Sequence, residues 1–340
     1  MRLLWPQFSA LSLVADARVS ARVLVTGAGG FVGNILCELL AQSGFTVRAA
    51  LRAARPLPAA VAEQIAVGDI GAGTVWLPAL EGVDYIVHAA ARVHVMNEAV
   101  PHRDLYDETN AQGTLRLASA AASAGVRRFV YLSSVKVNGE ENADHSYMAT
   151  DEPKPQDAYG VSKWRAEQYL RQVGEADSLE YAIVRPPLVY GPGVRANFLR
   201  LLKWIDEERL VPLGAIRNRR SMVSVWNLSD LVLNLLTNPA GRNRTWMVSD
   251  GVDLSTPDLI RFIARTMGRR ARLLSVPGGM LKLLGRAAGK GPEISRLCGS
   301  LSVDIAETRT ALGWTPALTM EAGLARTVEW YLAGRPSCEH

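Results

Sequence analysis

The chain has 340 residues, of which 48% are apolar and 21% charged, so it can bury a large core and is not a disordered tail. Its 38 Lys and Arg residues against 33 Asp and Glu residues give a net charge of +5. This excess is too small and too dispersed to indicate nucleic acid binding, and it suits a small anionic ligand equally well. Three distant cysteines, Cys37, Cys298 and Cys338, predict neither a disulfide framework nor a metal site, so a reducing cytoplasm is expected.

The sequence contains no segment typical of a membrane span or a signal peptide. No stretch reaches the roughly 20 uninterrupted apolar residues of a membrane-spanning helix, because Pro, Gly or charged residues interrupt every run. We therefore expect a soluble protein. Residues 1–20 carry one early basic residue, Arg2, and an apolar run broken by Pro6, Gln7 and Asp16, which predicts a loosely attached leader.

From residue 22 onward, short β-branched runs alternate with helical segments, the pattern of βαβ units around a parallel sheet. A strand is expected at 22–26, a turn at 27–30, a helix at 31–43 and a second strand at 46–51. Further strands are expected at 65–68, 83–89, 128–133 and 181–186, with helices at 107–124 and 158–172. The predicted fold class is α/β, a doubly wound parallel sheet of the Rossmann type, in a first domain over residues 21–185 that returns near 221–250.

Beyond residue 186 the composition shifts to Gly and Pro around shorter elements, which predicts a smaller α+β domain over residues 186–340. Its expected elements are 197–208, 221–225, 229–237, 244–248, 256–267, 281–288 and 320–332. The helix near Thr256 has a strong start signal, because a hydroxyl caps exposed amides and Pro257 loses no hydrogen bond in the first turn. We expect the two domains to pack across a cleft.

A glycine motif joins the first strand to the first helix, with Gly27, Gly30 and Gly33 at intervals of three residues. Gly27 permits the sharp turn, Gly30 lets a pyrophosphate approach bare backbone, and Gly33 lets the helix lie close to the sheet. The N-terminus of that helix then offers N–H groups and a positive dipole end to the phosphates. The motif in this context predicts a dinucleotide site; a tight turn without a ligand is the alternative.

The second strand ends without the Asp or Glu that usually binds the adenosine ribose, and Arg52 follows it. Arg52, with Arg48 or Arg55 in reach, would favour a 2′-phosphate, so NADPH is predicted ahead of NAD. An ordinary solvated charge is the alternative for Arg52. Asp69, after the third strand, is a candidate partner of the adenine amino group or an ordinary loop residue.

Tyr159 and Lys163 stand four residues apart at the head of a predicted helix, so both side chains lie on one face. A nearby ammonium group lowers the pKa of a phenol from its usual value near 10, and we expect Tyr159 to exchange a proton with a substrate hydroxyl or carbonyl near neutral pH. Ser133 and Ser134 end a strand at the sheet edge where such folds bind ligands. A chance surface pair is the alternative for Tyr159 and Lys163.

Taken together, these motifs resemble the extended short-chain dehydrogenase/reductase family, the NAD-dependent epimerase/dehydratase group of nucleotide-sugar enzymes, over residues 22 to about 330. The matching segments are Thr26-Gly27-Ala-Gly-Gly30-Phe31-Val-Gly33, Gly68-Asp69-Ile70, His88-Ala-Ala-Ala91, Thr109-Asn110-Ala-Gln-Gly113-Thr114, Ser133-Ser134-Val135, Tyr159-Gly-Val-Ser-Lys163, Arg185-Pro186-Pro-Leu-Val-Tyr190-Gly-Pro-Gly193 and Leu312-Gly313-Trp314. The resemblance implies that Ser134, Tyr159 and Lys163 are the catalytic residues. The cofactor contacts that it implies, together with those predicted above, are Gly27, Gly30, Phe31, Val32, Gly33, Arg52, Asp69, Ile70, Ala89, Ala90, Tyr159, Lys163 and Pro186.

The resemblance also implies where a UDP-sugar substrate would bind. Ser134 would contact the sugar, and the diphosphate would meet Asn197 and Arg220, with Arg296 as a weaker third candidate. A planar guanidinium suits this task, because it binds phosphate oxygens through two hydrogen bonds and stays charged. His94 and Lys136 are candidates for shaping the sugar pocket, although a lone His is more often structural.

Segments 91–98, 137–140 and 188–198 are most similar to bacterial surface-polysaccharide and O-antigen enzymes that form UDP-N-acetylquinovosamine. This likeness implies NADPH-dependent reduction of the C4 keto group of a UDP-linked 4-keto-6-deoxy-N-acetylhexosamine, with Tyr159 protonating the new alkoxide. One alternative is a UDP-hexose 4-epimerase, acting on UDP-glucose or UDP-N-acetylglucosamine with tightly bound NAD. A second is a non-catalytic NADP-sensing regulator. The related proteins also imply a homodimer.

Overall fold

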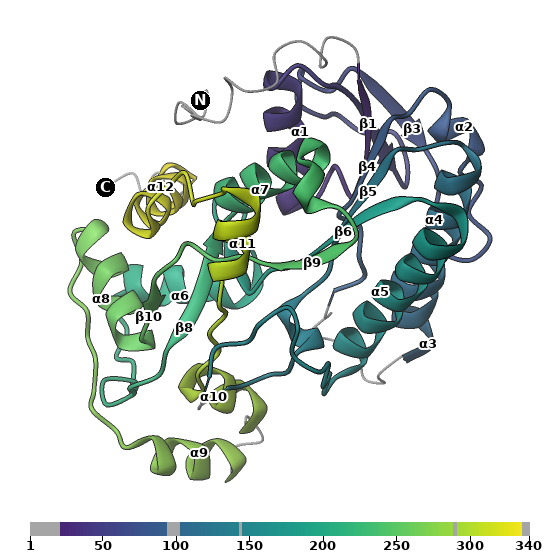
Figure 1. Ribbon diagram of the computed structural model, residues 1–340. Helices are drawn as coiled ribbons and strands as arrows, with labels where there is room; N and C mark the ends of the chain where they lie inside the picture. The colour runs from purple at the N-terminus through teal and green to yellow at the C-terminus, as the bar shows by residue number, and fades with distance from the viewer. Residues whose placement is uncertain (1–20, 94–102, 143–144, 288–290, 335–340) are drawn as a thin grey trace.

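The computed structural model describes residues 21–93, 103–142, 145–287 and 291–334, and its centre is a sheet of seven parallel strands in the order β3-β2-β1-β4-β5-β6-β9 (Figure 1). The strands are β1 (Arg22–Thr26), β2 (Thr46–Leu51), β3 (Glu63–Ala66), β4 (Tyr85–His88), β5 (Arg128–Leu132), β6 (Glu180–Arg185) and β9 (Arg244–Met247). The predicted α/β class with a Rossmann-type sheet is confirmed.

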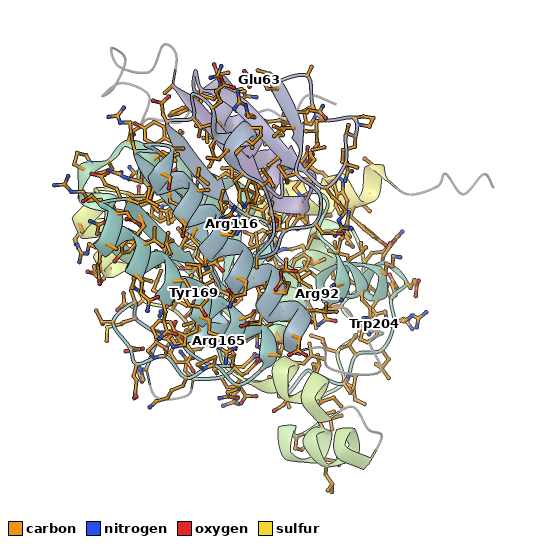
Figure 2. The ribbon with its side chains drawn as sticks, turned by 90° about the vertical axis from the view of Figure 1, so that its right-hand side faces the viewer. Glu63, Arg92, Arg116, Arg165, Tyr169 and Trp204 are labelled. Atoms are coloured by element: carbon orange, nitrogen blue, oxygen red, sulfur yellow. The ribbon has the colours of Figure 1, made fainter. Side chains whose placement is uncertain are left out.

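Helices cover both faces of this sheet. Helices α1 (Phe31–Gln42) and α7 (Val225–Thr237) share one core with Val23 and Val25 of β1, whereas α4 (Gly113–Ser123) and α5 (Ala158–Asp177) share the other with Leu24. Successive strand residues point to opposite faces, so a strand buried on both sides reads as an unbroken apolar run. Figure 2 looks onto the α4 and α5 layer, where Arg116, Arg165 and Tyr169 are labelled.

The strand order changes direction at β1, which pairs in parallel with β2 on one side and with β4 on the other. From this point the strands follow one another outward in both directions. Open α/β sheets bind ligands outside the carboxyl ends of the strands at such a switch point. Here that edge carries the glycine turn after β1 and Ala89 and Ala90 after β4.

A second, mixed sheet contains β7 (Leu188–Tyr190), β8 (Arg220–Ser224) and β10 (Asp253–Leu254). It shares a core with α6 (Ala196–Asp206), α8 (Thr256–Thr266) and α12 (Met320–Ala333). Helices α9 (Gly278–Ala287) and α10 (Gly291–Cys298) project at one end (Figures 1 and 2). The chain returns to the large sheet at β9, while the division into domains at residue 185 stays a prediction.

The structure differs from the predicted elements mainly where segments are short or irregular. The helix expected at 107–124 is a π-helical segment η2 (Asp107–Gln112) followed by α4, and a further helix, α3 (Arg103–Tyr106), precedes it. Six further elements are too short for a periodic pattern to predict, namely α2 (Leu77–Leu80), η3 (Val135–Val137), β7, η4 (Pro239–Gly241), β10 and α11 (Ala306–Leu312), and α10 was also not predicted. In the part of the chain that is described, no helix combines the length and apolar character needed to cross a bilayer.

Candidate active site

The glycine turn after β1 brings strand, helix and neighbouring strand into close contact. Gly27 has φ of +70°, and a Cβ atom there would lie 2.7 Å from the backbone nitrogen of Ala90. A Cβ atom on Gly33 would lie 2.2 Å from the carbonyl oxygen of Gly27. Any side chain at either position would push α1 or β4 away from the turn.

This turn fits the phosphates of a dinucleotide. Gly30 precedes α1, and no side chain of the described residues caps the helix. The amides of the first turn, which includes Phe31 and Val32, therefore have no intrahelical partners and face outward with the positive end of the helix dipole. A cradle of bare backbone at a helix N-terminus is the usual binding place for a pyrophosphate.

A chain of buried hydrogen bonds holds Ala90 above the turn. The Ala90 amide donates to Thr26 Oγ1 (3.2 Å), Thr26 Oγ1 lies 2.6 Å from His88 Nδ1, and His88 Nε2 lies 3.1 Å from Thr114 Oγ1. Thr114 donates its proton to the carbonyl of Asn110 (2.6 Å), so the neutral His88 carries its proton on Nε2. Burial, together with the charge of Lys163, lowers the pKa of His88 to about 3.

The predicted adenosine contacts lie at the ends of β2 and β3. Arg52 and Asp69 form an ion pair of 2.6 Å, and both side chains are 81% exposed, so the pair is weak and easily opened. Arg48 pairs instead with Glu63 (2.6 Å). Arg55 reaches the glycine turn, because a Cβ atom on Gly29 would lie 2.9 Å from its Nη1. Of the other predicted contacts, Ile70 packs partly buried against the core and Pro186 is buried, its carbonyl accepting the Val135 amide.

A cavity of about 1160 Å³ opens beside the same turn. Its walls are formed by the start of α1, the loop after β2, the loop after β7 and the end of α12, with Gly29, Gly30, Phe31, Arg55, Arg195 and Trp330 among the lining residues. The described residues that line it include none of Ser134, Tyr159 and Lys163. The cavity therefore lies beside the glycine turn and not beside these three residues.

Ser134, Tyr159 and Lys163, here called the catalytic group, come together at the carboxyl edge of β5. Asp157 caps α5 by accepting from the Gly160 amide (2.7 Å), and the helix starts at Ala158, one residue before Tyr159. Lys163 Nζ donates to the carbonyl of Leu132 (2.7 Å) and lies 6.0 Å from the centre of the Tyr159 ring. The Ser134 hydroxyl lies near enough to the Tyr159 phenol to lower its pKa in part.

Burial dominates the protonation of this group. Burial raises the pKa of Tyr159 to about 12, and Ser134 offsets this rise only in part. Burial also lowers the pKa of Lys163 to about 7, against the opposing charge of Glu167. The expectation that Lys163 makes Tyr159 more acidic is therefore wrong for the protein alone, because the lysine is buried in the same place and is itself only partly charged.

Lys136 lies beside the catalytic group but is held by two carboxylates. Its Nζ lies 2.5 Å from Asp157 and 2.7 Å from Glu140, while its backbone amide donates to Ser134 Oγ (3.2 Å). Lys136 thus connects the segment after Ser134 with the start of α5, which carries Tyr159 and Lys163.

The predicted diphosphate contacts are distributed over separate elements. Arg220 opens β8 half-buried, and its Nη1 donates to the carbonyl of Gly299 (3.1 Å). Asn197 lies exposed on the first turn of α6 and accepts from Arg200 (2.6 Å), whereas Arg219 pairs with Asp253 (2.9 Å). The side chain of Arg296 and all of His94 lie outside the described residues.

Sequence reasoning gave no role to Asn110, which the π-helical segment η2 turns toward the site. Its side chain accepts from the Arg92 amide (2.8 Å) and donates to Ser162 Oγ (3.0 Å), and Ser162 in turn donates to the carbonyl of Tyr159 (2.8 Å). Asn110 belongs to a segment that matched the family pattern. The sequence motif around Asn110 could therefore have indicated its importance, but only the π-helical geometry of η2 shows what its side chain contacts.

The chain resembles known proteins over most of its length. The family described as NAD dependent epimerase/dehydratase matches residues 23–248. The chain is 39% identical over 322 residues to the UDP-glucose 4-epimerase of Vibrio cholerae, covering 93% of this chain and 97% of that protein. It is 28% identical over 324 residues to the N-acetyl-alpha-D-glucosaminyl-diphospho-ditrans,octacis-undecaprenol 4-epimerase of Escherichia coli O157:H7, covering 91% and 94%.

Among solved structures, MoeE5 in complex with UDP-glucose and NAD is similar at a TM-score of 0.75 and 26% identity, covering 92% of this chain and 99% of that one. The likeness extends over nearly the whole of both chains. Together with the family match and the full-length relatives, it shows that this chain belongs to the NAD-dependent epimerase/dehydratase family.

Proposed function

We propose that the chain is a UDP-hexose 4-epimerase that retains NAD and acts on UDP-glucose or UDP-N-acetylglucosamine. The observation that carries this choice is the 39% identity, over nearly the full length of both proteins, to the UDP-glucose 4-epimerase of Vibrio cholerae. It favours the alternative raised in the sequence analysis over reduction of a 4-keto sugar. The 4-epimerase of Escherichia coli O157:H7, which resembles the chain over 91% of its length, points the same way.

The catalytic group suits proton exchange at a sugar hydroxyl. A bound coenzyme would supply hydride exchange at carbon and, when oxidised, a positive charge. Tyr159 exchanges the proton of the 4-hydroxyl, and Ser134, which lies near that phenol, shares the same oxygen. Lys163, anchored on Leu132, adds positive charge whenever it is protonated. The pKa of Tyr159 near 12 keeps the phenol protonated until such positive charge arrives.

The further binding roles follow from the same proposal. We propose that the turn at Gly27, Gly30 and Gly33 holds the pyrophosphate and that Ala89 and Ala90 line the cleft beside it. Arg220 and Asn197 are proposed to meet the substrate diphosphate, for which Asn197 must release Arg200. The homodimer remains a prediction from the resemblance.

Reduction of a 4-keto sugar by NADPH is the second candidate. The specific observation in its favour is that β2 ends without a carboxylate and that Arg55 reaches the glycine turn. Arg52, the residue expected to meet a 2′-phosphate, would first have to leave Asp69. A reductase must also release its coenzyme after each turnover, whereas an epimerase keeps it.

One pair of assays separates these functions. The purified chain is incubated with UDP-glucose or UDP-N-acetylglucosamine, and in parallel with NADPH and a UDP-linked 4-keto-6-deoxy-N-acetylhexosamine. Formation of the C4 epimer without net coenzyme oxidation supports the epimerase. Stoichiometric NADPH oxidation with the keto sugar, and no epimer, supports the reductase. Coenzyme binding without either reaction supports the non-catalytic sensor and overturns both.

Tyr159→Phe is the matched control for these assays, because it removes the phenol oxygen and keeps the ring. We expect it to lower turnover by about 10²-fold or more, the usual contribution of a proton-transfer group, and to leave coenzyme affinity nearly unchanged. A variant with near-normal turnover would show that the catalytic group is assigned wrongly.

A further inference from the structure

A fully buried ion pair lies directly behind the catalytic group. Glu167 of α5 and Arg185 of β6 have side chains that are 0% and 1% exposed. Arg185 Nε donates to Glu167 Oε1 (2.9 Å) and Arg185 Nη2 to Glu167 Oε2 (2.7 Å), a two-pronged contact. Arg171, one turn further along α5, reaches Glu167 Oε2 at 3.3 Å.

The pair contacts each segment that carries a member of the catalytic group. Glu167 follows Lys163 by one helical turn, and it accepts a hydrogen bond from Ser133 Oγ (2.6 Å). Ser133 stands between Leu132, whose carbonyl holds Lys163, and Ser134. The pair therefore joins α5 to the strand end that positions both Lys163 and Ser134.

Arg185 extends the same connection beyond Ser134. Its Nη1 donates to Asn138 Oδ1 (3.1 Å), and Asn138 directly follows η3, the short helix that starts after Ser134. Strand β6, which ends at Arg185, also accepts the Ser133 amide through the carbonyl of Val184 (2.8 Å). The backbone before and after Ser134 is thus fixed to a single pair of charges.

Stability alone is a weak reason for such a pair. Two charges lose most of their hydration on burial, and replacing a buried ion pair with apolar side chains is often neutral or stabilising. The surroundings of Lys163 suggest a different reason. Its Nζ lies 4.6 Å from the ring centre of Tyr131 and 6.0 Å from that of Tyr159, and the nearby His88 is neutral.

Glu167 is the carboxylate that opposes the effect of burial on Lys163. Arg185 and Arg171 form ion pairs with that same carboxylate, which partly neutralises their positive charges. Lys163 lies one turn before this carboxylate on the same face of α5, so the carboxylate partly offsets the effect of the arginine charges on Lys163.

We propose that Glu167 is a positioning residue for the catalytic group: with Arg185 it fixes the segments that hold Lys163 and Ser134, and its carboxylate favours the charged form of Lys163 one helical turn away. The part about catalysis rests on the proposed function, whereas the part about the charge of Lys163 does not. Loss of Glu167 should therefore change the titration of Lys163 even if the reaction is a different one.

The direct test is an NMR titration of the lysine side chains in the full chain as purified. The chain has six lysines, and Lys163→Met identifies the signal of Lys163. In Glu167→Gln we expect the titration midpoint of Lys163 to fall by about one pH unit, the lower end of the shift caused by an opposite charge at short range. Where this variant does not fold, Glu167→Gln with Arg185→Met removes both charges and should lower the midpoint in the same direction.

Glu180→Gln is the matched control. Glu180 opens β6 and pairs with Arg128, which opens β5, at 2.6 Å, so this pair holds β6 at the opposite end from Arg185. We expect the control to lower the melting temperature while leaving the Lys163 midpoint and the turnover unchanged. If Glu167→Gln lowers the melting temperature and also leaves the Lys163 midpoint where it was, Glu167 is merely structural and the proposal is overturned.

Kinetics provide the second readout. Glu167→Gln should lower kcat at pH 7.5 by about eightfold and change KM for the sugar nucleotide by less than twofold, because a fall of about one unit from a pKa of about 7 leaves about one eighth as much charged Lys163, while the binding residues stay in place. A raised KM with unchanged kcat would also overturn the proposal. Failure of the unaltered chain to turn over either substrate would count against the proposed function, and the NMR result would still decide the role of Glu167.

Discussion

The Gly33→Ala substitution tests the fit of the glycine turn most sharply. A Cβ atom there would lie 2.2 Å from the carbonyl oxygen, 2.7 Å from the carbonyl carbon of Gly27 and 2.9 Å from Cα of Ala28. All three are backbone atoms, which cannot rotate away as a side chain would. Carbon and oxygen normally approach no closer than about 3.3 Å, so α1 must move by about 1 Å.

Two effects of this movement can be estimated. Forcing a methyl group into packed structure costs about 1–3 kcal/mol, of which up to about 1 kcal/mol is returned because Ala is the better helix former. The second effect concerns the coenzyme. Hydrogen bonds to a charged phosphate contribute about 1.5–3 kcal/mol each, and losing one weakens binding at least tenfold, since about 1.4 kcal/mol corresponds to a factor of ten.

Gly44→Ala provides the comparison. Gly44 follows α1 with φ of +89°, and no described atom lies within 4 Å of a Cβ placed there. The cost is backbone strain alone, about 1–2 kcal/mol. Calorimetric titration of NAD into the coenzyme-stripped protein should show at least tenfold weaker binding for Gly33→Ala and unchanged binding for Gly44→Ala, although both lower the melting temperature. Equal NAD affinity in the two variants would refute the role of the turn.

Three further predictions follow from protonation and capping. Burial holds the pKa of Lys163 at about 7 against 10.5 when unfolded, so the unfolded chain binds the extra proton between these values. Stability should rise with pH in this window by up to about 1.4 kcal/mol per pH unit, and urea unfolding of Lys163→Met should show a flatter rise; equal slopes would contradict this. Burial likewise holds the pKa of His88 at about 3 against 6.5 in the unfolded chain, so stability is lost as the pH falls below 6.5. The free energy of unfolding of His88→Gln should fall less steeply over this range, although this variant is less stable than the unaltered chain at neutral pH. Asp157→Ala removes the cap on Gly160 and the partner of Lys136 and should cost about 1–2 kcal/mol, whereas Asp157→Asn should keep most of the cap; equal losses in urea unfolding would show that the cap is unimportant.

The local elements could be predicted because their causes lie close together in the chain. The strand expected at 46–51 is Thr46–Leu51, and the helix expected at 31–43 ends one residue early at Gln42. The glycine spacing and the position of Tyr159 and Lys163 on one helix face likewise depend on neighbours within a few residues. For the same reason the sequence already indicated a parallel sheet with a ligand at its carboxyl edge.

The charges in the site could not be predicted in this way. Lys163 meets the carbonyl of a residue 31 positions earlier, and Glu167 meets an arginine 18 positions later. These contacts remove water from around the groups, and this burial raises the pKa of Tyr159, opposite to the expected direction. The sequence likewise suggested Arg52 for the coenzyme, but the structure pairs it with Asp69 and brings Arg55 to the glycine turn.

The sequence by itself therefore determined the longer strands and helices of the parallel sheet, the glycine turn and the residue types of the catalytic group. Only the tertiary structure decided which of these side chains are buried, which charges face one another and where the π-helical turn places Asn110. The physical reason is that periodicity and capping act between residues a few positions apart, whereas desolvation and charge pairing depend on segments that folding brings together from distant parts of the chain.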